Sequence, residues 1–131
     1  MMLENMEPLF VTYHVNLIIS GHDHAYMRTY PMIGQKLDLT NNGPYYITIG
    51  AGGNREHHTR GYIHDQPEVW VVKRDNEEYG YGHLFVANAT HARFNWVRDG
   101  TTTEGIQDSV WLTNQLFLQK KIDRNGSSAS T

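Results

Sequence analysis

The sequence of 131 residues contains no cysteine, few basic residues and no long apolar run. Without cysteine, disulfide bonds and thiolate metal sites are excluded, and with them a structural zinc knuckle. The apolar runs are far shorter than the roughly 18 residues that a membrane span needs. Lysine and arginine number 11 against 14 acidic residues, so no basic surface for nucleic acid is predicted. The length fits a single globular domain.

Histidine, by contrast, is frequent, with eight in the chain, and it is the commonest metal ligand in proteins. Two of these histidines lie in Gly21-His22-Asp23-His24, directly after the apolar run 15–20 (VNLIIS). The run predicts a strand buried on both faces of a layered sheet. Ligand sites in such sheets lie just beyond the carboxyl ends of strands. If the segment is extended, alternate residues point the same way, so His22 and His24 are predicted to share a metal site.

The spacing alone leaves alternatives open. A pair of histidines with one residue between them also arises by chance in a histidine-rich chain. Asp23 is either a group that hydrogen-bonds a ligand histidine or a solvated loop carboxylate, and the second is favoured. His57 and His58 are neighbours, so on an extended loop they would point to opposite faces. They are therefore assigned to a surface loop.

The remaining pattern predicts a β-rich domain over 1–126 and a disordered Ser/Ala/Thr tail at 127–131. A regular helix is predicted between Pro8 and Tyr13, because proline starts or kinks a helix. A strand at 45–50 leads into a glycine-rich loop at 50–54, and a long surface loop at 55–82 follows. Three β segments are predicted at 84–87, 91–98 and 109–112, with a turn at 98–100. A short helix is predicted at 115–122. Trp70, Trp96 and Trp111 are assigned to the core or to sheet packing.

Four blocks in order resemble the purple acid phosphatases of the calcineurin-like metallophosphoesterase superfamily. They are 15–29 (VNLIISGHDHAYMRT), 43–56 (GPYYITIGAGGNRE), the pair 81–83 (YGH) and 88–91 (NATH), and 108–112 (DSVWL). The resemblance covers roughly residues 3–113. Met27 departs from it, because the family usually has glutamate there, and Asp23 stands where plant members commonly have an apolar residue.

The resemblance implies an α+β fold, namely the C-terminal part of a layered αββα sandwich with the last metal-binding block at 15–29 and a β region at 44–113. It implies hydrolysis of phosphate monoesters at acidic pH by a dinuclear centre of Fe(III) with Zn, Mn or Fe(II). His22 would bind the divalent ion and His24 the iron. Family members are secreted, lysosomal or vacuolar, whereas the first residues here do not form a signal peptide. Asn88 and Asn125 lie in glycosylation sequons, which also arise by chance.

The other ligands implied by the resemblance are not among the twenty residues before Gly21. We therefore expect a C-terminal piece of an enzyme that is inactive alone and needs the N-terminal portion as a partner to act on a phosphate-ester substrate. No catalytic residue is assigned. Two alternatives remain: a non-catalytic remnant with a binding or structural role, and a phosphodiesterase or nucleotidase of the wider superfamily.

Overall fold

The structure is a computed structural model, and it describes residues 2–53, 55–58, 61–99, 105–118 and 120. Among these residues helix α1 comes first and is followed by nine strands. Their bounds are α1 (Met2–Thr12), β1 (Leu17–Ser20), β2 (Tyr26–Thr29), β3 (Met32–Ile33), β4 (Lys36–Leu37), β5 (Tyr45–Ile49), β6 (Val71–Asp75), β7 (Gly80–Val86), β8 (His91–Arg98) and β9 (Gly105–Thr113). Residues 115–118 add a short helical turn.

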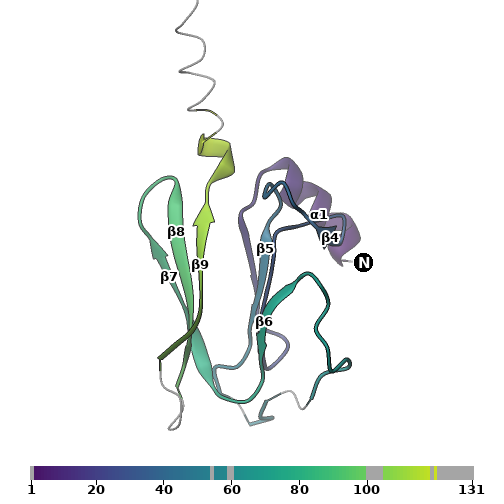
Figure 1. The fold of residues 1–131 in the computed structure, drawn as a ribbon, viewed down its shortest axis with the longest axis vertical. Helices are drawn as coiled ribbons and strands as arrows, with labels where there is room; N and C mark the ends of the chain where they lie inside the picture. The colour runs from purple at the N-terminus through teal and green to yellow at the C-terminus, as the bar shows by residue number, and fades with distance from the viewer. Residues whose placement is uncertain (1, 54, 59–60, 100–104, 119, 121–131) are drawn as a thin grey trace, which may run out of the picture.

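Two sheets form the body of the molecule (Figure 1). The first sheet has the order β1-β5-β2-β6, with β1 and β5 parallel and β2 antiparallel to both of its neighbours. The meander sheet is the antiparallel set β7-β8-β9. Helix α1 lies on the side of the first sheet away from the meander, so the layers are helix, sheet and sheet. Strands β3 and β4 pair in a small separate hairpin.

The core lies between the two sheets and is built from aromatic rings. Tyr26 from β2 and Phe94 and Trp96 from β8 are buried, together with Ile47 and Leu112. The rings of Tyr26 and Trp96 stack in parallel with centroids 4.5 Å apart. Alternation along β8 turns Phe94 and Trp96 to the same inner face. Each such side chain contributes about 2–3 kcal/mol by leaving water.

An ion pair crosses the core between the first sheet and the meander. Arg28 on β2 donates two hydrogen bonds to the Asp108 carboxylate on β9, at 2.7 and 2.8 Å, and the Tyr26 hydroxyl donates a third at 2.7 Å. Burial raises the pKa of Asp108, but the hydrogen bonds from Arg28 and Tyr26 outweigh it and leave the pKa below its usual value. Arg28 and Asp108 therefore join the first sheet to the meander.

A second ion pair links the far strand of the first sheet to the meander. Asp75, at the end of β6, accepts two hydrogen bonds from Arg98 at 2.6 and 2.7 Å and one from the Trp96 indole at 3.1 Å. Burial raises the pKa of Asp75, and these donors more than offset it, so the pKa is lowered. Both inward-facing carboxylates are thus satisfied within this chain.

Several sequence predictions are confirmed and others are wrong. The strand at 45–50 and the three-stranded meander are present. The helix, however, begins at Met2 and continues through Pro8. Pro8 is exposed, and because proline has no N–H the helix lacks the hydrogen bond to the Glu4 carbonyl. The region 55–82 is also not one continuous loop, because it contains β6, which pairs with β2.

Two residues predicted to be buried are exposed. Strand β1 is an edge strand, and Ile19 is 47% exposed, so the strand is not buried on both faces. Trp111 is 53% exposed on the outer face of the meander, whereas Trp96 is fully buried. Asn125, the tail at 127–131 and parts of the predicted turn at 98–100 and helix at 115–122 lie outside the described residues. Over the described ranges no helix is long and apolar enough to cross a membrane.

Candidate metal centre

The two predicted ligand histidines lie in the loop that connects β1 to β2. Strand β1 ends at Ser20, and the chain bends through residues 22–25 before β2 begins at Tyr26. The Ala25 amide donates to the Asp23 carbonyl at 2.8 Å and closes a tight turn. The segment is therefore not extended, and the alternation argument that placed both imidazoles on one side is wrong. His22 is exposed, whereas His24 is partly buried.

His24 is held in a definite orientation by a backbone carbonyl. Its Nδ1 lies 3.1 Å from the carbonyl oxygen of His57. Because a carbonyl can only accept, Nδ1 carries the proton, and in the neutral ring Nε2 is left with its lone pair. Metal-binding histidines show this same division of roles, with the second ring nitrogen donating to a carbonyl or carboxylate. The donor chemistry of His24 thus fits a metal ligand. Its Nε2 lies 3.9 Å from Glu56 Oε2.

The carbonyl that orients His24 comes from a strained residue. His57 has φ of 64°, in the left-handed region, where a residue with a side chain is disfavoured by about 1–2 kcal/mol. Next to it, the His58 ring stacks on Tyr79 with centroids 4.0 Å apart and anchors the loop. The imidazole of His57 is exposed, in agreement with the predicted surface loop. Sequence reasoning missed the role of its backbone, because a carbonyl group gives no residue-type signal.

Gly50 allows the histidine loop to pack against the end of β5. A Cβ on Gly50 would lie 1.9 Å from the Asp23 carbonyl oxygen and 2.7 Å from that of Gly21, so no other residue fits. The Gly50 amide donates to the Ala25 carbonyl at 3.1 Å. The glycine-rich loop at 50–54 is therefore in contact with the histidine loop at its first residue, Gly50.

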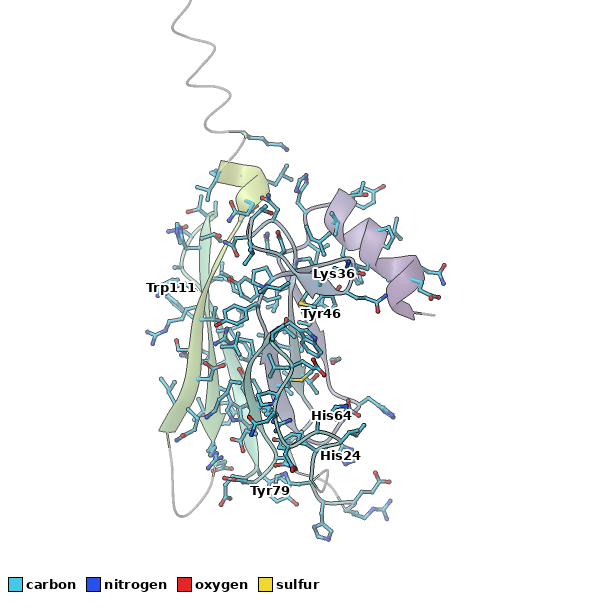
Figure 2. The ribbon with its side chains drawn as sticks, turned by 45° about the vertical axis from the view of Figure 1, so that its right-hand side comes forward. His24, Lys36, Tyr46, His64, Tyr79 and Trp111 are labelled. Atoms are coloured by element: carbon cyan, nitrogen blue, oxygen red, sulfur yellow. The ribbon has the colours of Figure 1, made fainter. Side chains whose placement is uncertain are left out.

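A cavity of about 510 Å³ adjoins the histidine loop at Asp23. Much of its lining comes from the segment 61–71, which Arg74 contacts. The guanidinium of Arg74 lies 3.8 Å from the centroid of the Tyr62 ring and donates to the backbone carbonyls of His64 and Asp65. Figure 2 shows His24 and His64 toward the same end of the molecule.

Within the described residues no three histidine or carboxylate side chains are grouped closely enough to hold a metal ion. The geometry therefore fits one oriented histidine, His24, with His22 exposed two residues away. The Asp23 carboxylate is exposed in the same loop. Its assignment as a solvated carboxylate, and the assignment of His22 and His24 as ligands, stay predictions.

Comparison with known protein families shows to which family the chain belongs. Residues 43–109 match the family described as iron/zinc purple acid phosphatase-like protein C. The chain belongs to the purple acid phosphatase family. Two relatives from Arabidopsis thaliana, probable purple acid phosphatase 20 and purple acid phosphatase 18, are each 41% identical to it. The matches cover 88% and 86% of this chain but only 26% and 25% of those proteins.

Two further comparisons concern the fold and the metals of relatives. The purple acid phosphatase from yellow lupin seeds superposes with a TM-score of 0.69 at 18% identity, over 82% of this chain and 19% of that one. This confirms the predicted metallophosphoesterase fold. A relative named Fe(3+)-Zn(2+) purple acid phosphatase 12, from Arabidopsis thaliana, is 33% identical over 124 residues, 88% of this chain and 26% of that protein. The chain thus spans about a quarter of the length of the relatives that it matches.

Proposed function

We propose that this chain supplies the two-histidine part of a dinuclear metal centre that hydrolyses phosphate monoesters under acidic conditions. The observation that carries the proposal is the orientation of His24, whose Nδ1 is bonded to the His57 carbonyl so that Nε2 is available to a metal. Membership of a family that includes an Fe(3+)-Zn(2+) phosphatase supports the metal pair and the reaction class.

In this proposal His24 binds the iron and His22 binds the divalent ion, which is zinc, manganese or iron. When bound, such a pair of ions acts as a Lewis acid toward the phosphoryl oxygens. Two imidazoles are fewer than the three protein ligands that catalytic sites commonly supply to one ion. The other ligands therefore come from a polypeptide that corresponds to the part of the relatives not matched here.

The lowered pKa values of two carboxylates in the sandwich support function at acidic pH. Because the pKa values of Asp75 and Asp108 are lowered in the folded chain, their stabilisation is complete above the unfolded carboxyl pKa of about 4. It is lost only as the pH falls through the still lower folded values. At pH 5 both ion pairs are intact, so both links between the first sheet and the meander are kept.

Reconstitution tests the proposal. The chain would be refolded together with the preceding portion of purple acid phosphatase 20, loaded with iron and zinc, and assayed on a generic phosphomonoester at pH 5. Activity should require both polypeptides and fall by more than about a hundredfold for His24→Ala and for His22→Ala. His83→Ala, in the meander, is the control and should retain activity. Equal activity in all three variants would contradict the assignment.

A non-catalytic role in binding or structure is the second candidate. It is favoured by the lack of a three-residue metal cluster among the described residues. The same assay separates the two, because a non-catalytic piece would restore no activity to the preceding portion. Turnover by this chain alone would contradict both.

A further inference from the structure

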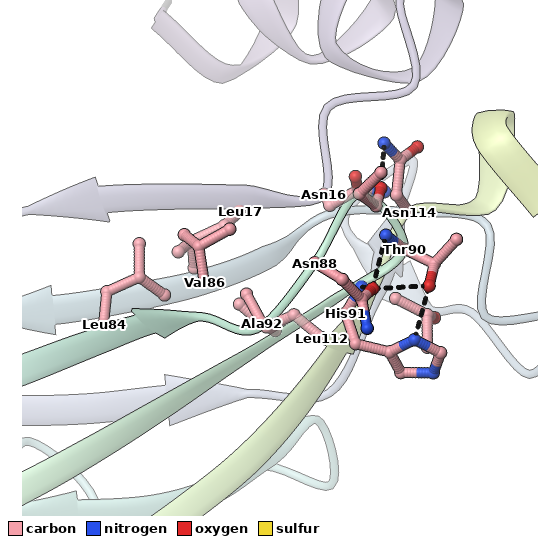
Figure 3. A pocket seen from close by; sticks show the side chains of 12 residues that line it. Asn16, Leu17, Leu84, Val86, Asn88, Thr90, His91, Ala92, Leu112 and Asn114 are labelled. Carbon is pink, nitrogen blue, oxygen red and sulfur yellow. Dashed lines mark hydrogen bonds between the residues drawn. The ribbon is translucent and has the colours of Figure 1, made fainter.

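Two cavities outside the histidine loop differ in whether their polar side chains are already bonded. The first, of about 210 Å³, lies between β1 and the meander (Figure 3). Its polar wall includes the turn at 88–91, where the Asn88 side-chain oxygen accepts from the Thr90 amide and hydroxyl and from the His91 amide. The Thr90 hydroxyl in turn lies 2.7 Å from His91 Nδ1. These groups are bonded to one another, so they offer little to a ligand.

The second cavity, of about 380 Å³, lies on the face of the first sheet that α1 covers. Met27 of β2 and Tyr46 of β5 line it, and they alternate along their strands with Tyr26 and Ile47, which face the core. Glu7 lines it from α1. A volume of this size is typical of pockets that bind small molecules. The cavity is therefore separate from the core and from the histidine loop.

Glu7 brings a buried carboxylate to this cavity. The residue is only 6% exposed. One of its oxygens, Oε1, accepts from the Gln35 amide at 3.2 Å, which joins the β3–β4 hairpin to the helix. Whereas Asp75 and Asp108 are each paired with an arginine, no lysine, arginine or histidine in the described part of the chain forms an ion pair with Glu7. A buried carboxylate is costly unless a cation accompanies it, so Glu7 is suited to a cationic ligand.

The Tyr46 hydroxyl is a second unused group at the same cavity. It is buried and makes no hydrogen bond to any described residue. Burial, and then the negative charge of Glu7, raise the pKa of Tyr46, so the hydroxyl stays neutral at pH 7. A neutral hydroxyl oxygen can accept a hydrogen bond from an N–H group. Other hydroxyls that line the cavity are already bonded, Thr29 to a backbone carbonyl and Ser20 to Thr48.

The rest of the lining is largely apolar and includes Met27, Met32 and Trp70. We propose that this cavity binds a small organic ammonium compound whose N–H groups bond to the Glu7 carboxylate and the Tyr46 hydroxyl. The apolar body of the compound lies against the two methionines and the indole. Aromatic rings also attract ammonium groups. The site contains no residue of the proposed metal centre, so the proposal does not depend on the proposed function.

Three probes of nearly the same shape and different charge test the proposal on the unaltered chain. They are phenethylamine, which is a cation at pH 7, the neutral phenethyl alcohol, and the hydrocinnamate anion. In a titration followed by NMR of methyl groups, the amine should shift the signals of Met27 and Met32. Those of Leu84, which lines the cavity of Figure 3, should not move.

The alcohol should bind at least about tenfold more weakly than the amine, because hydrogen bonds between charged groups are the stronger ones. The anion should not bind. Equal affinity for the amine and the alcohol would overturn the proposal, and so would unchanged Met27 and Met32 signals. This comparison needs no variant, so it decides the matter even if a substitution at Glu7 prevents folding.

Substitutions identify the groups that recognise the amine. Glu7→Gln keeps an acceptor for the Gln35 amide but removes the charge, and it should weaken amine binding at least about tenfold with little effect on the alcohol. Tyr46→Phe should weaken amine binding about threefold or more. Glu4→Gln removes the same charge from an exposed position on the same helix and is the matched control. If Glu7→Gln binds the amine as tightly as Glu4→Gln does, the proposal is wrong.

One further variant separates this site from the metal centre. His24→Ala should bind phenethylamine as tightly as the unaltered chain, because His24 does not line the cavity. Loss of phosphatase activity in that variant would therefore leave the ammonium site intact. Loss of amine binding in it would contradict the location proposed for the site.

Discussion

The interior between the sheets and the histidine loop at the end of β1 differ in how their polar side chains are held by this chain. In the interior the carboxylates of Asp75 and Asp108 are each held by an arginine and a neutral donor. At the loop one histidine is oriented by a strained backbone carbonyl and the other is exposed. The sandwich is thus stabilised by contacts within the chain, whereas the loop has one oriented and one exposed histidine.

The two tryptophans of the meander give the largest expected difference between a buried and an open site. Trp96→Ala should lower the free energy of unfolding by about 3–5 kcal/mol, because the ring is fully buried against Tyr26. Trp111→Ala should cost only about 0.5–1 kcal/mol, since half of that ring is already in solvent. Urea denaturation of both variants measures the difference. Equal costs would mean that the outer face of the meander is packed in solution.

Replacing the ion-paired carboxylate of Asp108 and the exposed carboxylate of Asp23 should have different effects on stability. Asp108→Asn should destabilise the fold by about 3 kcal/mol, because the nearly buried Arg28 loses its charged partner. Asp23→Asn should leave the free energy of unfolding within about 0.5 kcal/mol, as expected for a solvated loop residue. Thermal and urea unfolding at pH 7 would show this. A large cost at Asp23 would show that the loop is a structural part of the sandwich.

Gly50 lies where the two regions meet, and a smaller effect is expected there. Gly50→Ala should cost about 1–3 kcal/mol, since the added Cβ meets the Asp23 carbonyl. It should also release the His24 Nδ1 proton from the His57 carbonyl, which nitrogen NMR of the imidazole reports. Gly52→Ala is the matched control, because a Cβ at Gly52 meets nothing within 4 Å. If the His24 signal is unchanged in Gly50→Ala, the loop does not depend on this close approach.

The regular part of the fold could be predicted from local pattern. Strand β5 and the meander follow from runs of β-branched and alternating residues between turn signals. Strand β6 was missed because its sequence, VVKRD, is short and mostly polar, and it is stabilised by pairing with β2 and by the Asp75 ion pair. The strand pattern also could not tell that Trp96 faces inward and Trp111 outward, because both faces of β9 carry apolar residues.

For the site, the sequence identified the residue types but not how they are held. Gly21-His22-Asp23-His24 and the glycine-rich loop were found from the motif and the resemblance. The orientation of His24 depends on a backbone carbonyl at His57 with a positive φ, and histidine at that position gives no sign of it. The bend at 22–25 likewise depends on the contact between Gly50 and Asp23, which joins residues far apart in the chain.

We propose that the sandwich is stable by itself while its histidine loop is only part of a metal site. Thermal unfolding of the isolated chain, in EDTA and with excess zinc, tests this most directly. A complete site would couple metal binding to folding and raise the unfolding midpoint. We predict a cooperative transition whose midpoint is the same in both conditions. A chain that is unfolded in EDTA, or a midpoint raised by zinc and lowered again by His24→Ala, would contradict the account.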